Sequence, residues 1–215
     1  MTTEQPADQA SRAVAVEFEG PGASVIRGQR FGVGDRWALL AHGVGKDLDV
    51  WRRIAPSLAG RGLSVLTFDL PGHGASDDPW DPRLAPAAVA AAVTFARTQG
   101  ARQVHIVGEG VAAIAALAVA AADSSEVTSV TALSPQPDDL VAGNDQIREA
   151  RIPKLILVGS SSRSAAEFAE LVYRRAIGPC EMARFPVGAQ GSDLLYGVWG
   201  EQALDKVLAH MLRQA

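Results

Sequence analysis

The chain has 215 residues, of which 47% are hydrophobic and 20% are charged. This length suits one well-buried domain and is short for two. The formal net charge is −4, so composition gives no support for a nucleic-acid partner. Cys180 is the single cysteine, which excludes an internal disulfide framework and is typical of a reducing compartment.

The N-terminal segment is polar and contains no apolar stretch of the kind found in secretion signals. The longest apolar run, from Val111 to Ala122, is mostly alanine and too short to span a bilayer. We therefore expect residues 1–12 to form a disordered tail and residues 13–215 to form one domain. We also expect a cytoplasmic protein with no membrane partner.

The first expected elements form an antiparallel hairpin at a sheet edge, with Gly20-Pro21-Gly22 turning between Ala13–Phe18 and Ser24–Arg27. From Trp37 onward, apolar strands alternate with helical segments. This alternation predicts a mostly parallel sheet with helices on both faces. The further expected strands are Trp37–Ala41, Leu63–Phe68, the segment around His105, Ser129–Leu133, Leu155–Val158 and Cys180–Phe185.

The expected helices are placed by their capping residues. Asp49 is expected to cap a helix that runs through Gly60. Ser164 and Glu167 have the spacing of a capping box, which predicts a helix that Gly178 ends. The remaining expected helices run from Pro86 to near Gly100, from Val111 onward, and over Glu201–Arg213.

Three glycine-containing turns follow expected strands. They are His42-Gly43-Val44-Gly45, Asp69-Leu70-Pro71-Gly72-His73-Gly74-Ala75-Ser76-Asp77 and Gly108-Glu109-Gly110-Val111-Ala112. In this order they resemble the HG-x-G turn, the D-x-P-G-x-G-x-S turn and the nucleophile elbow of the α/β-hydrolase fold family. The resemblance extends from about Trp37 to the C-terminus. It implies that His73 is a turn residue that packs or hydrogen-bonds locally.

The resemblance also implies an architecture. We expect the α/β-hydrolase fold, with a mostly parallel central sheet, helices on both faces and no cap domain. Between Ser134 and Lys154 the chain leaves little room for the helical cap that many family members insert. By size and missing cap, the chain is similar to small esterases, lipases and dienelactone hydrolases.

The residues at the family's three catalytic positions are chemically unsuited to hydrolysis. Gly110 stands where the elbow carries its nucleophilic serine, and glycine has no hydroxyl. After the strand Leu155–Val158, Ser162 (less well Ser161) stands at the position of the acid, and a hydroxyl cannot stabilise an imidazolium. After the last strand, Gln190 stands at the position of the histidine, and an amide cannot relay a proton.

The resemblance further implies an oxyanion hole formed by the amides of Val44 and Val111. With the helix N-terminus, these amides could hold an anion or a carbonyl group. The sequence thus predicts a pseudoenzyme with a degenerate triad and no catalytic residue. Its ligand site is expected at Val44, Gly110, Val111 and Gln190, for a small molecule or a protein partner. No metal or cofactor is expected, because the histidines are isolated, and the sequence does not indicate an oligomeric state.

Two alternatives remain. One is an active enzyme, such as a hydrolase acting on carboxylic ester bonds, with Glu109, Asp138 or Asp139 as a displaced base; otherwise Asp138 and Asp139 are surface turn residues. Cys180 is excluded as nucleophile because it begins its strand, at the edge opposite the site.

The other alternative is a Rossmann-like dinucleotide-binding protein, since Gly108-x-Gly110-x-x-Ala113 also matches the dinucleotide-binding fingerprint. However, the acidic residue expected about 20 residues later is missing. A third, narrower possibility is a scaffold subunit of an active paralogue.

Overall fold

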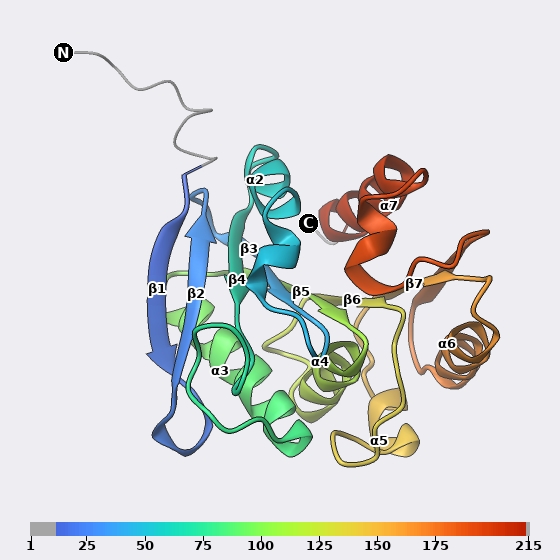
Figure 1. Cartoon of the computed structure of the whole chain (residues 1–215), viewed down its shortest axis with the longest axis horizontal. Coiled ribbons are helices and arrows are strands. Elements are labelled where there is room, and N and C mark those ends of the chain that lie inside the picture. The colour runs from blue at the N-terminus through green and yellow to red at the C-terminus, as the bar shows by residue number, and fades with distance from the viewer. Residues whose placement is uncertain (1–11, 214–215) are drawn as a thin grey trace.

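A computed structural model describes residues 12–213; apart from Arg12, the expected N-terminal tail lies outside the described residues. The centre of the described part is an eight-stranded sheet in the order β1-β2-β4-β3-β5-β6-β7-β8 (Figure 1). The strands are β1 (Val14–Glu19), β2 (Val25–Phe31), β3 (Arg36–Ala41), β4 (Ser64–Phe68), β5 (Gln103–Glu109), β6 (Ser129–Leu133), β7 (Lys154–Gly159) and β8 (Cys180–Phe185). β1 and β2 pair in antiparallel fashion and β2 joins β4 antiparallel, whereas the other neighbours are parallel. The expected mostly parallel sheet with an antiparallel edge hairpin is confirmed.

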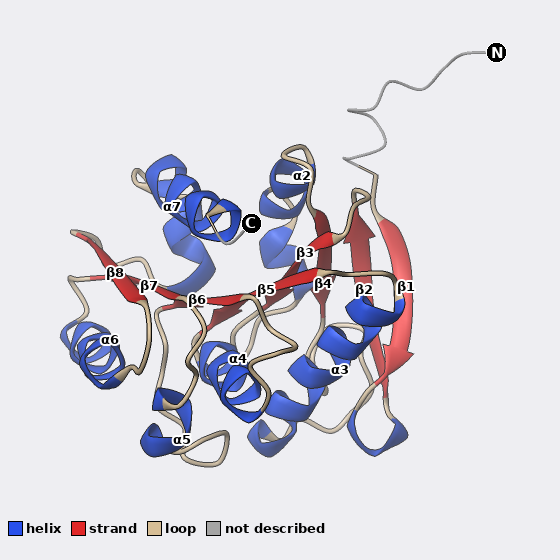
Figure 2. Ribbon diagram, turned by 180° about the vertical axis from the view of Figure 1, so that it is seen from behind, coloured by secondary structure: helices blue, strands red, loops and turns tan. Residues whose placement is uncertain are grey.

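Helices cover both faces of the sheet (Figures 1 and 2). One face carries α3 (Ala85–Thr98), α4 (Val111–Ala122), α5 (Asn144–Arg148) and α6 (Arg163–Arg175), and the other carries α2 (Ile54–Ala59) and α7 (Gly200–Leu212). Because side chains alternate along a strand, Ile106 and Val107 of β5 belong to the apolar cores on opposite faces. The alanine-rich α4 is almost entirely buried, which its composition predicts. Within residues 12–213, no helix has the length and apolar character needed to cross a bilayer.

Within the described residues, four short 3-10 helices complete the connections: η1 (Pro21–Ala23), η2 (Leu48–Trp51), η3 (Pro82–Leu84) and η4 (Gly191–Leu195). The connection between β6 and β7 contains α5, which was not expected from the sequence. α5 contacts α4 and α6, so this connection adds to the helical layer.

The predicted helix starts at Asp49 and Ser164 are wrong. Asp47 is the first cap instead, since its side chain accepts from the Asp49 amide at 3.0 Å, and it opens η2 rather than one continuous helix. Ser162 is the N-cap of α6, with extended backbone and no side-chain cap bond. Ser164 therefore already lies in the first helical turn, where it cannot act as the cap. α6 also ends at Arg175, before Gly178.

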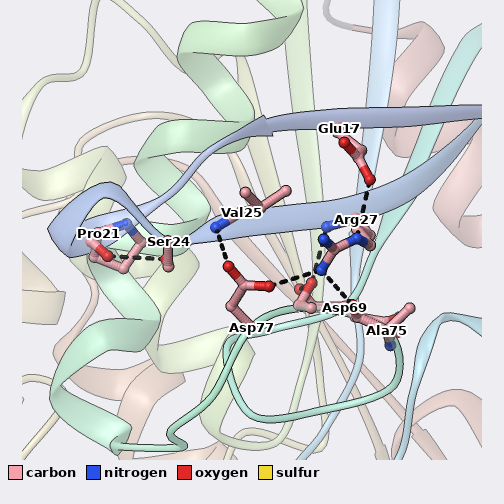
Figure 3. A network of polar contacts seen from close by, with 9 residues as sticks. Glu17, Pro21, Ser24, Val25, Arg27, Asp69, Ala75 and Asp77 are labelled. Atoms are coloured by element: carbon pink, nitrogen blue, oxygen red, sulfur yellow. Dashed lines mark hydrogen bonds and ion pairs between the residues drawn. The ribbon is translucent and has the colours of Figure 1, made fainter.

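The expected turn over residues 69–77 is held against β2 by a polar network (Figure 3). The Arg27 guanidinium donates to Asp77 Oδ1 at 2.8 Å and to the Ala75 carbonyl at 2.7 Å. Asp77 Oδ2 accepts from the Val25 amide at 3.0 Å, and the bond from Arg27 lowers the pKa of the Asp77 carboxyl. These contacts join the edge hairpin to the turn and fix the turn beside the end of β3.

Candidate functional site

Gly110 forms the sharp turn from β5 into α4. Its backbone angles are φ 59° and ψ −116°, a conformation that glycine adopts more readily than any residue with a Cβ. Its amide donates to the Leu133 carbonyl at 3.0 Å, and its carbonyl accepts from the Gln136 amide at 3.3 Å. A Cβ at position 110 would lie 3.6 Å from the Gln136 side chain, which is ordinary contact. The turn therefore favours glycine through its backbone and has room for a side chain.

A pocket of about 260 Å³ opens at this turn. It lies at the carboxyl ends of strands, where open α/β sheets bind their ligands. The pocket is lined by Gly43, Val44, Lys46, Glu109, Gly110, Ser134, Gln136, Gln190, Gly191 and Asp193. Three predicted ligand residues, Val44, Gly110 and Gln190, are thus brought together. Val111 is not among these lining residues, because it begins α4 directly behind Gly110.

An ion pair inside the pocket was missed by the sequence reasoning. Lys46 Nζ donates to Glu109 Oε1 at 2.6 Å and to Ser192 Oγ at 3.1 Å, and lies 3.5 Å from Asp193 Oδ2. The Glu109 side chain is 9% exposed, so the charge of its carboxylate is offset mainly by Lys46. A visible signal was that Lys46 is one of only three lysines and closely follows the HG-x-G turn.

Two glycines leave room for the Glu109 carboxylate. A Cβ on Gly191 would lie 2.0 Å from Glu109 Oε1, and one on Gly43 would lie 3.3 Å from the same oxygen. The Gly191 amide donates to Ser134 Oγ at 2.9 Å. The Glu109 side chain therefore links the loops that follow β3 and β8 at the pocket.

Gln190 is oriented by the end of β7. Its Nε2 donates to the Gly159 carbonyl at 2.8 Å and more weakly to the Gly188 carbonyl at 3.4 Å. Gln190 Oε1 and Glu109 Oε2 are both buried, and neither has a hydrogen-bond partner among the described residues. Buried acceptors of this kind are rare in folded proteins and are unfavourable unless something pairs with them.

The other acidic or nucleophilic candidates lie away from the pocket lining. Ser162, expected at the position of the acid, caps α6. Asp138 Oδ1 accepts from the Leu140 amide at 2.9 Å, and Asp139 is exposed, as expected for turn residues. Cys180 is the first residue of β8, and burial raises the pKa of its thiol to about 11. The thiol is therefore protonated at neutral pH.

The ring nitrogens of two histidines beside the pocket form hydrogen bonds with backbone groups. His42 Nε2 accepts from the Leu70 amide at 3.0 Å, so the ring proton is on Nδ1, which donates to the Gly43 carbonyl at 2.8 Å. Burial lowers the pKa of His42, which favours this neutral form. His73 Nε2 accepts from the Gly45 amide at 3.2 Å, which confirms its predicted local role. In the described chain, no three or more His, Cys, Asp or Glu side chains are grouped to hold a metal ion.

Comparisons with known proteins identify the family. The family model of the alpha/beta hydrolase fold matches residues 38–153, which is more than half of the chain. The chain therefore belongs to the α/β-hydrolase fold family. This membership decides the fold against the Rossmann-like alternative.

Solved structures show the same fold. An esterase from Pyrococcus furiosus, Pf2001, superposes with a TM-score of 0.80 at 16% identity, covering 99% of this chain and 96% of that one. The alpha/beta hydrolase GrgF from Penicillium sp. sh18 gives a TM-score of 0.81 at 16% identity, covering 94% and 99%. At such low identity, the likeness is one of fold.

A curated relative matches in sequence over a shorter region. It is the dihydrolipoyllysine-residue acetyltransferase component of the acetoin cleaving system of Cupriavidus necator, 34% identical over 139 residues. The match covers 61% of this chain and only 36% of that relative.

Proposed function

We propose that this protein is a non-catalytic member of the α/β-hydrolase fold family that binds a small molecule in the pocket around Gly110. The observation that carries the proposal is Gly110 itself, a residue without a reactive side chain at the elbow turn. Gln190 supports it, because its amide nitrogen is engaged by the Gly159 carbonyl and does not titrate near neutral pH. Positions 110 and 190 therefore do not supply the nucleophile–base pair that acyl transfer needs.

The features needed for binding are retained beside this loss. The pocket is lined by Val44 and by Gly110, the residue that directly precedes α4. The first amides of a helix have no partner within the helix and attract anions and carbonyl oxygens. Val44 itself is 51% exposed, so it does not offer a buried apolar surface to a ligand. A protein partner at the same mouth is the second kind of ligand that this arrangement accommodates.

A second candidate function is an enzyme with displaced chemistry, acting on an ester or another acyl group. Of the three acids considered as displaced bases, only Glu109 lines the pocket, and the Cupriavidus necator relative is by name an acetyltransferase component. Two observations count against Glu109 as a general base. Its Oε1 already accepts a hydrogen bond from Lys46, and position 110 has no hydroxyl or thiol that a base could deprotonate. A non-catalytic function is consistent with the paired Glu109 carboxylate and with the missing nucleophile at position 110.

Turnover of short nitrophenyl esters tests the proposal. The wild-type protein should give no turnover above the buffer rate. Gly110→Ser alone should also be inactive, because Gln190 and Ser162 cannot activate the new hydroxyl. The double variant Gly110→Ser, Gln190→His is the comparison, since both positions line the pocket and the variant supplies a hydroxyl and an imidazole there. Wild-type turnover that disappears in Glu109→Gln would overturn the proposal in favour of the displaced enzyme.

A further inference from the structure

β1 is an end strand of the sheet, and one of its two backbone edges is paired. β2 pairs with it in antiparallel fashion over all six residues, from Val14 to Glu19, without a break in register. Among the described residues, no strand lies on the other side of β1 (Figure 2). The outer amides and carbonyls of such a strand are a template for pairing with a further strand.

β1 lacks the features that usually prevent pairing at a sheet edge. Proteins block their edges with proline, lysine, bulges or covering segments, and the sequence VAVEFE of β1 contains no proline and no lysine. The opposite end strand, β8, is different. Its Arg184 forms an ion pair with Glu170 of α6. Its Glu181 pairs with Arg213, which follows α7. Charged side chains thus tie β8 to the neighbouring helices, whereas the edge of β1 is open.

An apolar groove of about 470 Å³ runs beside this open edge, between β1 and α3. Its lining includes Phe18, Pro21, Ala87, Ala91, Thr94 and Phe95. Glu19 is the one charged residue among the described residues that line it. Val14 lies on the same face of β1 as Phe18, because side chains alternate along a strand, and it is 55% exposed. The edge therefore offers both an apolar groove and an exposed apolar side chain.

The apolar residues of β1 match a second copy of the same strand. In an antiparallel pair with Val16 opposite Val16 of the second copy, Val14 lies opposite Phe18. Five residues of each strand are then paired, and all three apolar residues meet on one face. Sliding one strand by a single residue would instead place these apolar residues opposite the other face of β1, which carries the two glutamates.

The charged residues of β1 fit the same register. Glu17 lies opposite Ala15 of the second copy, so no two glutamates are directly opposite each other. Glu19 lies opposite Ala13, beside the exposed Arg12 of the second copy. Sliding by two residues in one direction would place Glu17 opposite Glu17, which is unfavourable. Sliding by two in the other direction leaves only residues 14–16 of each strand paired.

We propose that this chain forms a symmetric homodimer through β1, in which the two sheets join and Val14 of each copy covers the groove at Phe18 of the other. A two-fold axis through Val16 relates the copies, the commonest symmetry of homo-oligomers. The contact is confined to one strand and one groove, which is small beside the roughly 1,600 Å² of a standard interface. We therefore expect a reversible dimer. The proposal is independent of the proposed function, because none of the residues that line the Gly110 pocket belongs to β1 or α3.

Sedimentation velocity of the full chain over a series of protein concentrations tests the proposal. The mass should rise with concentration from that of one chain, 22.5 kDa, toward twice that value. Val14→Lys places a charge opposite Phe18 of the second copy. It should weaken the dimer about tenfold at each of its two contacts, the effect of no longer burying one valine. Val198→Lys is the matched control, since Val198 is 96% exposed and lies outside β1 and the groove. It should leave the dimer unchanged.

Two substitutions at the exposed Ala15 test the register, because they should act in opposite directions. Ala15→Glu places a carboxylate opposite Glu17 of the second copy and should weaken the dimer, whereas Ala15→Lys should strengthen it. Glu17 already pairs with Arg27 at 2.9 Å, so we expect a change of about threefold in either direction. Both changes should decrease at high salt.

The outcomes decide the proposal as follows. A mass of one chain throughout the concentration series would overturn it. A dimer that Val14→Lys leaves intact would also overturn it, since the copies would then meet elsewhere. If Val14→Lys unfolds the chain, the Ala15 variants decide, and equal shifts in the same direction contradict pairing through β1. Turnover of nitrophenyl esters, which tests the proposed function, is a separate measurement.

Discussion

Two neighbouring polar sites at the carboxyl ends of the strands differ in how many of their buried hydrogen-bond acceptors have a partner within the protein. At the turn over residues 69–77, Asp69 Oδ1 accepts from the Leu48 amide at 2.7 Å and Oδ2 from the Ala75 amide at 2.8 Å. At the pocket, Glu109 and Gln190 each keep an unpaired buried oxygen. The fold itself completes the first site, whereas the second remains incomplete. Buried acceptors without a partner are uncommon in folded proteins.

The two sites also differ in free space around a glycine with positive φ. A Cβ on Gly74 would lie 2.2 Å from Asp69 Oδ2, whereas a Cβ on Gly110 would meet nothing closer than 3.6 Å. The Asp69 side chain fills the space beside Gly74 in the turn, whereas the space beside Gly110 in the elbow is free. Substitutions at the two sites should therefore have very different effects.

The largest effect is expected for Gly74→Ala. The new methyl group collides with the Asp69 carboxylate, and the residue keeps an unfavourable φ of 50°. We expect the free energy of unfolding to fall by about 4 kcal/mol, as for other substitutions that force strain on a buried network. Urea unfolding followed by circular dichroism measures this. A loss no greater than that of Gly110→Ala would contradict the contrast between a closed and an open site.

The next largest effect is expected for Lys46→Met. It leaves the buried Glu109 carboxylate without its counter-charge, which costs about 2 kcal/mol because Lys46 is itself partly exposed. Lys206→Met, at an exposed position on α7, is the matched control. Equal stabilities of the two variants would show that the ion pair contributes nothing.

Acidification should weaken the completed site through His42. Burial lowers the pKa of His42 below its ordinary value of 6.5, so below pH 6.5 the unfolded chain binds a proton that the folded chain does not. Stability is therefore fully present above pH 6.5 and falls as the pH decreases, by about 1.4 kcal/mol per pH unit. His105 acts in the same direction down to about pH 3, since burial lowers its pKa to about 3.

The variant His42→Gln isolates this contribution. Its amide oxygen can accept from the Leu70 amide in place of Nε2, and it does not titrate. The dependence of its unfolding free energy on pH should be shallower than that of the wild type below pH 6.5. Parallel curves for the two proteins would mean that folded His42 binds its proton freely.

The smallest effect is expected for Gly110→Ser. The side chain has room, and only the backbone conformation is strained, which costs about 1 kcal/mol. A thermal unfolding scan should show a modest decrease in melting temperature. An unchanged melting temperature would mean that the elbow holds no strain for a residue with a Cβ.

Much of the fold could be predicted from sequence because its signals are local. Continuous apolar runs marked the strands, and glycine-rich turns marked their carboxyl ends. The helix starts could not be fixed in the same way. Asp47 and Asp49 are both suitable caps, as are Ser162 and Ser164, and only the three-dimensional path of the loop selects between them.

The site was only partly predictable for a related reason. Gly110 and Gln190 follow strands whose ends had been located, so their meeting could be inferred. The ion pair joins Lys46 and Glu109 across 63 positions of sequence. It depends on β3 and β5 being adjacent and in register, with Ala41 opposite Gly108. Ser162, expected at the position of the acid, lies at the start of α6 and outside the pocket lining, and no local pattern reports the path of the loop after β7.

The central claim, a binding pocket without a nucleophile, is tested most directly by intact-mass spectrometry after incubation with a fluorophosphonate probe. The account predicts an unchanged mass for the wild-type protein, alongside full modification of a serine esterase treated in parallel. A stoichiometric adduct that maps to a residue of the pocket would contradict it.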